Sequence, residues 1–433
     1  MIAQQSMQHS DVKAKVEIPS FQSVTLIHGN TREIFLPSYT KGLVMRSEIL
    51  PFHQPSIGEE EVAEVVDTLR SGWITTGPKV KKFEAQFTDY VSASEALAIG
   101  SCTAGLHLSL AALGIGPGDE VITTTLTFAA SVNVIEHVGA KPVLVDVDPA
   151  TLNIDIQSVK EAISPRTKAV IAVHFAGHPV DLDALSNVLR PLGIPIVEDA
   201  AHAIGASYQG RPIGHGENLT SFSFYATKNL TTAEGGMLTG PSHLVERART
   251  LSLHGLSRDA WQRYTPGANW RYDVVAPGFK YNMTDLQASI GIWQLRKFVD
   301  FQRRRGEIAE RYNQAFSNYE FFEIPAQRDD IEHAWHLYTL RLRPEYLTID
   351  RDSYLQELLA RKIGTSVHFI PVHTHPYYRD RYGYCDQDFP IAMSNFERMF
   401  SLPLHPQLTD DDVTDVIEAV IEIGVGNRKR LAS

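Results

Sequence analysis

The stretch ALAIGSCTAGLHLSLAALGIGPGDEVITT, residues 96–124, contains the pattern that predicts the fold. A short apolar run at 96–100 leads through small residues into a leucine-rich segment of helical length, and a second strand-like run, EVITT, follows at 120–124. Short apolar runs that alternate with helical segments are typical of βαβ units, whose parallel strands are buried on both faces. The stretch therefore predicts two strands of one sheet joined by a helix.

The same alternation continues along the chain. Further strands are expected at 142–147, 169–173 and 195–198, and helices at 56–69, 131–138, 156–163 and 183–189. We therefore predict an α/β protein with a mostly parallel central sheet covered by helices. Ligands of such sheets bind at the carboxyl ends of the strands, so candidate chemical groups are expected there.

The pattern changes after about residue 285. The elements expected there are helices at 285–299, 304–316, 351–361 and 410–421, and a half-buried strand at 337–342. They are typical of a smaller α+β domain. We predict three parts: an N-terminal extension of unknown order at 1–45, a large α/β domain at 46–290 and a small C-terminal α+β domain at 291–433. The basic run Arg303-Arg304-Arg305 is interpreted as the solvated face of a helix.

Composition limits the class of protein. The chain has 433 residues and a formal net charge of −11, which argues against broad, non-specific nucleic-acid binding. Its two cysteines, Cys102 and Cys385, do not support a disulfide framework. No signal-peptide pattern and no apolar run of about 20 residues is found, so a cytoplasmic protein without a membrane partner is expected.

Asp199 and Lys228 are the first candidates for chemistry. Asp199 follows the apolar strand at 196–198, where a buried carboxylate needs a cationic partner. A protonated pyridine nitrogen would supply that partner, and a helix N-cap is the alternative role. Lys228 follows the strand residues Phe222 and Phe224 among small and apolar neighbours, where burial would lower its pKa and leave a nucleophilic amine. An ordinary loop lysine in water is the alternative.

A third candidate is the turn Gly100-Ser101-Cys102-Thr103-Ala104-Gly105, which joins a strand to a helix. Small residues there let helix N–H groups approach a phosphate, and the hydroxyl of Ser223 could add to that site. Phe128 could cover a flat ring, with a place in the core as its alternative, and Cys102 is interpreted as a packing residue. A ring-nitrogen partner, an amine 29 positions later (228 − 199) and a phosphate turn together match pyridoxal 5′-phosphate (PLP).

At these residues the sequence resembles the DegT/StrS-type sugar aminotransferases (the DegT/DnrJ/EryC1/StrS family), which are fold-type-I PLP enzymes. The resemblance runs from about Leu50 to Ile423. The matching strings are Glu198-Asp199-Ala200-Ala201-His202-Ala203, Phe222-Ser223-Phe224, Lys228-Asn229, Glu234-Gly235-Gly236 and Tyr281-Asn282-Met283-Thr284-Asp285-Leu286-Gln287-Ala288.

Within that family the chain looks most similar to the enzymes that form UDP-4-amino-4-deoxy-L-arabinose. The strings behind this similarity include residues 71–78 (SGWITTGP), 333–337 (HAWHL) and 364–369 (GTSVHF). Where many relatives read Gly-Tyr-Asn-Tyr-Arg, this chain reads Gly278-Phe279-Lys280-Tyr281-Asn282. The difference leaves open whether Lys280 or Asn282 reaches the partner's site in a dimer.

The resemblance implies roles for individual residues. Lys228 would form the Schiff base with PLP, and the other cofactor-binding residues would be Asp199, His202, Ser223, Thr103, Ala104, Phe128 and Asn282. Substrate-binding residues would be Thr76, Lys280 and His368. The resemblance further implies a homodimer with shared sites. Glutamate would give its amino group, leaving 2-oxoglutarate, and a keto group, expected at C4, of a nucleotide-linked sugar would receive it.

Several alternatives stay open. They are a C3 sugar aminotransferase, a PLP-dependent sugar dehydratase on the same fold, and a non-catalytic PLP-binding regulator. The lysine at 228 argues against the dehydratase, because dehydratases of this family carry histidine there. A nicotinamide dehydrogenase is disfavoured, because no Gly-x-Gly-x-x-Gly string follows the first strand. The histidine pairs 333/336 and 373/375 lack further ligands of suitable spacing, so no metal is expected.

Overall fold

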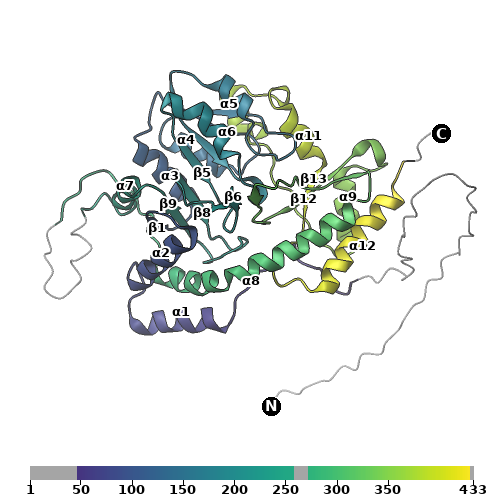
Figure 1. The fold of residues 1–433 in the computed structure, drawn as a ribbon, viewed down its shortest axis with the longest axis horizontal. Helices are drawn as coiled ribbons and strands as arrows, with labels where there is room; N and C mark the ends of the chain where they lie inside the picture. Colours follow the sequence, from purple (N-terminus) through teal and green to yellow (C-terminus); the bar gives the residue numbers. More distant parts are fainter. Residues whose placement is uncertain (1–45, 258–271, 430–433) are drawn as a thin grey trace, which may run out of the picture. The chain divides into compact units, whose positions relative to one another are not determined.

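The computed structural model describes residues 46–257 and 272–429, and a seven-stranded sheet forms the core of its larger part (Figure 1). The strand order is β1-β9-β8-β5-β4-β2-β3. Only the pairings of β9 with β1 and β8 are antiparallel among the pairings of this sheet. The bounds are β1 (Ala96–Ile99), β2 (Glu120–Thr124), β3 (Lys141–Val145), β4 (Thr167–Val173), β5 (Ile196–Asp199), β8 (Leu219–Ser223) and β9 (Gly236–Thr239). The predicted α/β fold with a mostly parallel sheet is confirmed.

Helices cover both faces of this sheet, so nearly all residues of its strands are buried. In β4, Ala169 and Ile171 pack with α3 and α4, whereas Val170 and Ala172 pack with α5 and α6. Phe222 of β8 packs with α2 and α8. The bounds of the helices around the sheet are α1 (Glu59–Ser71), α2 (Pro78–Val91), α3 (Cys102–Leu113), α4 (Ala130–His137), α5 (Ile156–Ala162), α6 (Leu182–Leu189) and α7 (Ser242–Ser252).

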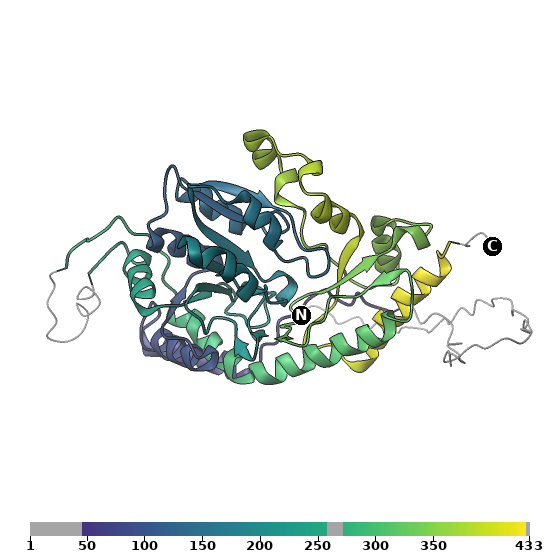
Figure 2. The same cartoon turned by 45° about the horizontal axis from the view of Figure 1, so that its top comes forward.

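One long helix, α8 (Asp285–Phe316), connects the large sheet to a second core. Its first half contacts α1 and α2, and its second half contacts α12, so it runs along both parts of the protein (Figure 2). The prediction of two helices here is wrong, because no proline or glycine interrupts 299–304 and the buried face continues through Phe298, Arg305 and Ile308. The predicted boundary at 290/291 falls inside this helix, and the division into two domains stays a prediction.

The buried position of Arg305 corrects the interpretation of residues 303–305 as a solvated face. Arg303 is exposed and pairs with Glu307, as expected for that face. Arg305 is only 1% exposed and donates to the carbonyl oxygens of Trp335 at 3.1 Å and Leu404 at 2.7 Å. The two side chains lie two positions apart, about 200° around the helix, so the arginine run cannot face solvent along its whole length.

The second core surrounds a small sheet of order β10-β12-β13 (Figure 1). Strand β12 was predicted to be half-buried, but all five of its residues are buried. Its polar side faces protein rather than water: Arg341 donates to the carbonyl oxygen of Pro149 at 2.8 Å and pairs with Glu323 at 2.8 Å. The bounds are β10 (Phe322–Glu323), β12 (Tyr338–Leu342), β13 (Met399–Leu402), α9 (Arg351–Ala360), α10 (Pro376–Tyr382), α11 (Pro390–Arg398) and α12 (Asp410–Gly426).

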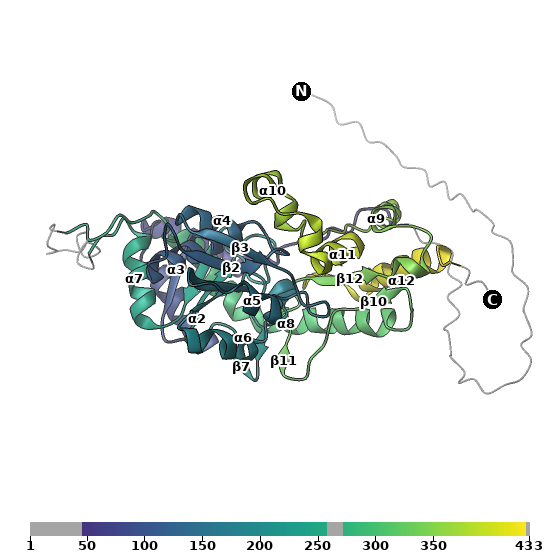
Figure 3. The same cartoon turned by 90° about the horizontal axis from the view of Figure 1, so that it is seen from above.

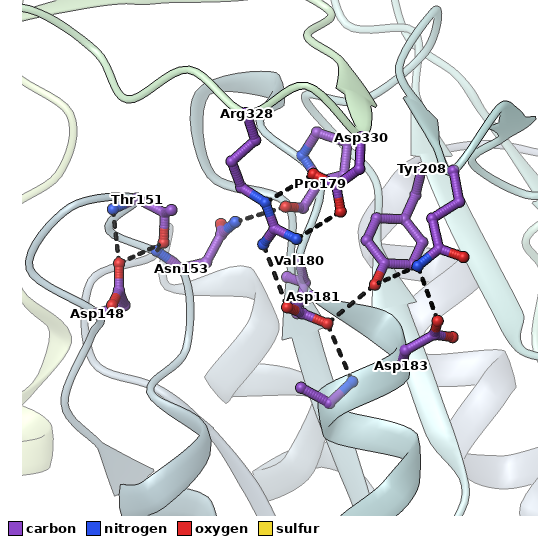
Figure 4. A network of polar contacts seen from close by, with 12 residues as sticks. Asp148, Thr151, Asn153, Pro179, Val180, Asp181, Asp183, Tyr208, Arg328 and Asp330 are labelled. Atoms are coloured by element: carbon purple, nitrogen blue, oxygen red, sulfur yellow. Dashed lines mark hydrogen bonds and ion pairs between the residues drawn. The ribbon is translucent and has the colours of Figure 1, made fainter.

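Two of the further connections between this part and the large sheet are made by α10 and by a third sheet. Helix α10 approaches α4 (Figure 3), and the hydroxyl of Tyr378 contacts Asn133 there. A third sheet, β11 (Ile331–Glu332) with β6 (Ser207–Tyr208) and β7 (Arg211–Pro212), lies at the other connection. There Arg328 binds both Asp330 and Asp181 (Figure 4). Within the described residues, no helix is long and apolar enough to cross a bilayer.

Candidate active site

A cavity of about 360 Å³ lies at the carboxyl ends of the central strands and the start of α3. Seven of the predicted site residues line it: Thr103, Phe128, Asp199, His202, Ser223, Lys228 and His368. They come from segments far apart in the sequence, as expected for a site at the edge of a parallel sheet. The other four, Thr76, Ala104, Lys280 and Asn282, do not line it.

Asp199 is the last residue of β5 and is buried. Its Oδ2 accepts a hydrogen bond from the hydroxyl of Ser131 at 2.6 Å, and its Oδ1 accepts one from the backbone N–H of Ala201 at 3.1 Å. The thiol of Cys102 is 3.7 Å from the same Oδ1. Turns rather than a helix follow Asp199, which excludes the N-cap role.

No ion pair neutralises this carboxylate within 46–257 and 272–429. Burying an unpaired charge is costly, so the cavity beside Asp199 suits a cationic group.

Lys228 lies in the turn after β8 and points its amine into the same cavity. Its Nζ is 3.4 Å from Nε2 of His336. Burial lowers the pKa of Lys228 to about 8, against the opposing influence of the negative charge of Asp199. At neutral pH about a tenth of such an amine is unprotonated, a far larger fraction than for a lysine in water. The alternative of a fully solvated loop lysine is therefore wrong.

Aromatic rings form the walls of the cavity. Phe128 is 63% exposed and its ring centroid lies 5.9 Å from that of Phe369, so Phe128 is not a core residue. The ring of His202 stacks on Phe369 at 5.7 Å with an interplanar angle of 20°. Burial, together with the positive charge of Lys228, lowers the pKa of His202 well below its usual value, so its ring is neutral. Such walls suit a flat aromatic ligand.

The turn before α3 has the features expected of a phosphate site. Ser101 is the N-cap of α3, and its hydroxyl accepts from the N–H of Ala104 at 3.1 Å. The N–H of Ala104 is thus already engaged, whereas Ser101, Thr103 and Ser223 line the cavity. A Cβ on Gly236 would lie 2.7 Å from the backbone nitrogen of Cys102, so the turn packs this closely on β9 only because residue 236 is glycine.

Three predicted site residues form a separate group beside this turn. Nζ of Lys280 donates to Oδ1 of Asn282 at 2.5 Å, and Nδ2 of Asn282 donates to the hydroxyl of Thr76 at 2.7 Å. The backbone of Asn282 pairs with Ile99 of β1, next to the phosphate turn. The group therefore lies close to the turn but outside the cavity of its own chain.

Phe369 of the aromatic wall was missed by the sequence analysis, and so were two residues that contact predicted ones. Ser131 contacts Asp199 directly, and no local pattern marks a serine in the first turn of a helix for that role. His336 contacts Lys228, although it was considered only as half of a metal pair. Its string His333-Ala334-Trp335-His336-Leu337 belongs to the family resemblance, and this signal was enough to propose it as a site residue.

These features fit PLP as a group. Asp199 would face the ring nitrogen, Lys228 the aldehyde, the start of α3 the phosphate, and the aromatic walls the ring.

Comparisons with known proteins point to one family. Residues 55–421 match the model of the DegT/DnrJ/EryC1/StrS aminotransferase family. The uncharacterized protein MJ1066 of Methanocaldococcus jannaschii is 52% identical over 386 residues, which cover 89% of this chain and 100% of that protein. The spore coat polysaccharide biosynthesis protein SpsC of Bacillus subtilis is 50% identical over 390 residues, covering 88% and 98%.

A solved structure has the same fold with the cofactor. The PLP form of Spr1654 from Streptococcus pneumoniae, described as a candidate sugar aminotransferase, superposes with a TM-score of 0.81 at 37% identity, covering 87% of this chain and 99% of that one. Its PMP form superposes with the same score. Both forms belong to an amino-transfer cycle.

Proposed function

Because the chain belongs to the DegT/DnrJ/EryC1/StrS aminotransferase family and is a PLP-dependent aminotransferase, we propose that it transfers the amino group of glutamate to the C4 keto group of a nucleotide-linked sugar. One observation carries the proposal: Lys228 and Asp199 line the same aromatic-walled cavity, one as a poorly hydrated amine and the other as a carboxylate without a cation.

Bound PLP supplies an aldehyde that condenses with amines and a ring that withdraws electrons from the carbon attached to the nitrogen. Lys228 takes the proton from Cα of glutamate and, in the second half of the reaction, delivers a proton to the sugar carbon. A pKa near 8 suits both tasks at neutral pH. Asp199 would hold the proton on the ring nitrogen, Thr103 and Ser223 would bind the phosphate, and Phe128 and His202 would contact the ring.

The nature of the sugar is supported by the relatives. SpsC is named for polysaccharide biosynthesis, and sugars enter polysaccharides from activated carriers. The resemblance to UDP-4-amino-4-deoxy-L-arabinose enzymes favours a UDP-linked 4-keto pentose. His368 lines the cavity, where it would touch the sugar. Thr76 and the exposed amine of Lys280 lie outside the cavity of their own chain, so they would reach the sugar and its diphosphate only across a dimer.

We further propose a homodimer in which each site takes Asn282 or Lys280 from the partner. The position of Thr76, Lys280 and Asn282 beside the phosphate turn but outside their own cavity supports this. The exposed side chain of Trp73, whose indole N–H donates to the carbonyl oxygen of Thr76, adds an apolar surface to the same region. A cytoplasmic location stays a prediction from the sequence.

The test is to incubate the PLP-loaded protein with glutamate and a panel of UDP- and dTDP-linked 3-keto and 4-keto sugars. We expect 2-oxoglutarate and a nucleotide amino sugar, with the nitrogen located at C4 by NMR and the product confirmed by mass. Nitrogen at C3 would identify a C3 aminotransferase. Bound PLP without any product across the panel would contradict the proposal and favour a non-catalytic role. Lys228→Ala serves as the inactive control.

A further inference from the structure

The segment from Ile331 to Leu337 carries His336 to the amine of Lys228. Its start pairs with β6 through β11, next to the ion pairs of Arg328 (Figure 4). Beyond β11, the N–H of Ala334 donates to the carbonyl oxygen of Gly177 at 2.9 Å, and that of His336 to Ala176 at 3.1 Å. His336 is therefore held by backbone contacts to the large sheet on which Lys228 lies.

Asn229, the neighbour of Lys228, determines which nitrogen of His336 carries the proton. Nδ2 of Asn229 donates to the carbonyl oxygen of Ala334 at 2.7 Å, which directs Oδ1 of the amide toward Nδ1 of His336, 3.1 Å away. An amide oxygen only accepts, so Nδ1 of His336 must carry the proton. In a neutral ring the lone pair is then on Nε2, the atom that faces Nζ of Lys228 at 3.4 Å.

The surroundings keep this ring neutral. Burial lowers the pKa of His336 well below its usual value, and the positive charge of Lys228 acts in the same direction. The groups that face it are basic or neutral: Lys228, His202, Arg305 and His368. The two rings His202 and His336 lie 4.3 Å apart, so a second charge there would be repelled. Nε2 therefore remains an acceptor across the pH range in which aminotransferases work.

We propose that His336 is a positioning residue, which accepts a hydrogen bond at Nε2 from Nζ of Lys228 and holds the free amine inside the cavity. The inference rests on the proposed function only in taking Lys228 as the lysine that bonds to PLP. Once an amino donor has displaced Lys228 from PLP, Lys228 is a flexible side chain with several rotatable bonds. Its amine must nevertheless stay near the carbon that loses a proton. A fixed acceptor restricts that motion. The distance of 3.4 Å is long, as such contacts often are before a substrate binds.

Three variants separate positioning from a structural role. His336→Phe keeps the ring but removes the acceptor, and His336→Gln retains an acceptor near the position of Nε2. His333→Phe is the matched control, because His333 lies on the same segment but stacks on Trp335 at 4.0 Å instead of contacting Lys228.

The first readout is the pH midpoint at which Lys228 of the PLP-free protein reacts with an amine-directed reagent, measured by peptide mass spectrometry. In His336→Phe, loss of the acceptor for the ammonium N–H should lower this midpoint by about one pH unit. In His336→Gln the midpoint should stay close to the wild-type value, and in His333→Phe it should be unchanged. No sugar is present, so the result stands apart from whether the proposed substrate is correct.

The second readout is the steady-state rate with glutamate and the sugar substrate that the panel of keto sugars identifies. His336→Phe should lower kcat by about tenfold with little change in KM, and the acidic limb of its pH profile should follow the labelling midpoint. An unchanged midpoint in folded His336→Phe would overturn the proposal. Should His336→Phe fail to fold, Asn229→Ala takes its place, because it removes the acceptor for Nδ1–H of His336. Asn229→Ala must then lower the labelling midpoint of Lys228. An unchanged midpoint in that variant would likewise overturn the proposal.

Discussion

The hydroxyl of Ser131 lies 2.6 Å from Oδ2 of Asp199, although the two residues are 68 positions apart in the sequence. Ser131 is in the first turn of α4, and Asp199 ends β5. The hydroxyl of Thr127 lies 2.9 Å from that of Ser131. Since the one proton of Ser131 goes to the carboxylate, Thr127 donates to Ser131, and the two hydroxyls form a chain that ends on Asp199.

Ser131→Ala is expected to weaken PLP binding. A hydrogen bond to a charged group contributes about 1.5–3 kcal/mol, so its loss should raise the Kd for PLP by about tenfold or more. The Kd is measured by titrating the PLP-free protein. Ser109→Ala is the control, because it removes an equally buried hydroxyl that contacts only the carbonyl oxygen of Gly105 in α3. Equal Kd values for the two variants would show that Ser131 does not support Asp199.

The lowered pKa of Lys228 predicts its reactivity. In the PLP-free protein, labelling of Lys228 should rise through a midpoint near pH 8, more than two units below an ordinary lysine. The exposed Lys81 is the internal control. The same shift makes the free energy of unfolding depend on pH. Below about pH 8 the folded state must bury an ammonium, which lowers the free energy of unfolding. This penalty fades as the pH rises toward the unfolded pKa near 10.4. A labelling midpoint shared with Lys81 would contradict burial of the amine.

Mixed dimers test whether the partner supplies Asn282. The Lys228→Ala chain and the Asn282→Ala chain should each be inactive when expressed alone, and the two are then co-expressed. A mixed dimer then contains one site with both residues intact, so random pairing should restore about a quarter of the wild-type activity. Lys228→Ala mixed with Asp199→Ala is the control, because both residues line one cavity of one chain and no intact site can form. Recovery with Lys280→Ala but not with Asn282→Ala would assign the shared role to Lys280.

Gly236→Ala should damage the phosphate turn. The added Cβ would lie 2.6 Å from the carbonyl oxygen of Phe222 and 2.7 Å from the nitrogen of Cys102, and these backbone atoms cannot move independently. We expect a loss of about 2–4 kcal/mol in stability, seen as a lower Tm, and weaker PLP binding. Gly216→Ala is the control, because nothing lies within 4 Å of its added Cβ. A variant at 236 with unchanged Tm and Kd would contradict the close packing described for the turn.

Local patterns in the sequence predicted most elements of the large sheet. The strand expected at 120–124 is β2, and the helix expected after residue 100 is α3. Burial on both faces favours apolar residues such as Val121 and Ile122 in these strands, and this signal needs no knowledge of the partners. The continuity of α8 and the burial of Arg305 were missed, because both depend on the second core against which the helix packs.

By itself the sequence determined the α/β fold and pointed to Asp199, Lys228 and the turn at 100–105, because each follows a strand and carries its signal in its neighbours. Only the tertiary structure decided that Ser131 and His336 are their partners, and that Thr76, Lys280 and Asn282 gather outside the cavity. Hydrogen bonds between distant residues depend on how strands and helices pack, and this information is absent from any short stretch of the chain.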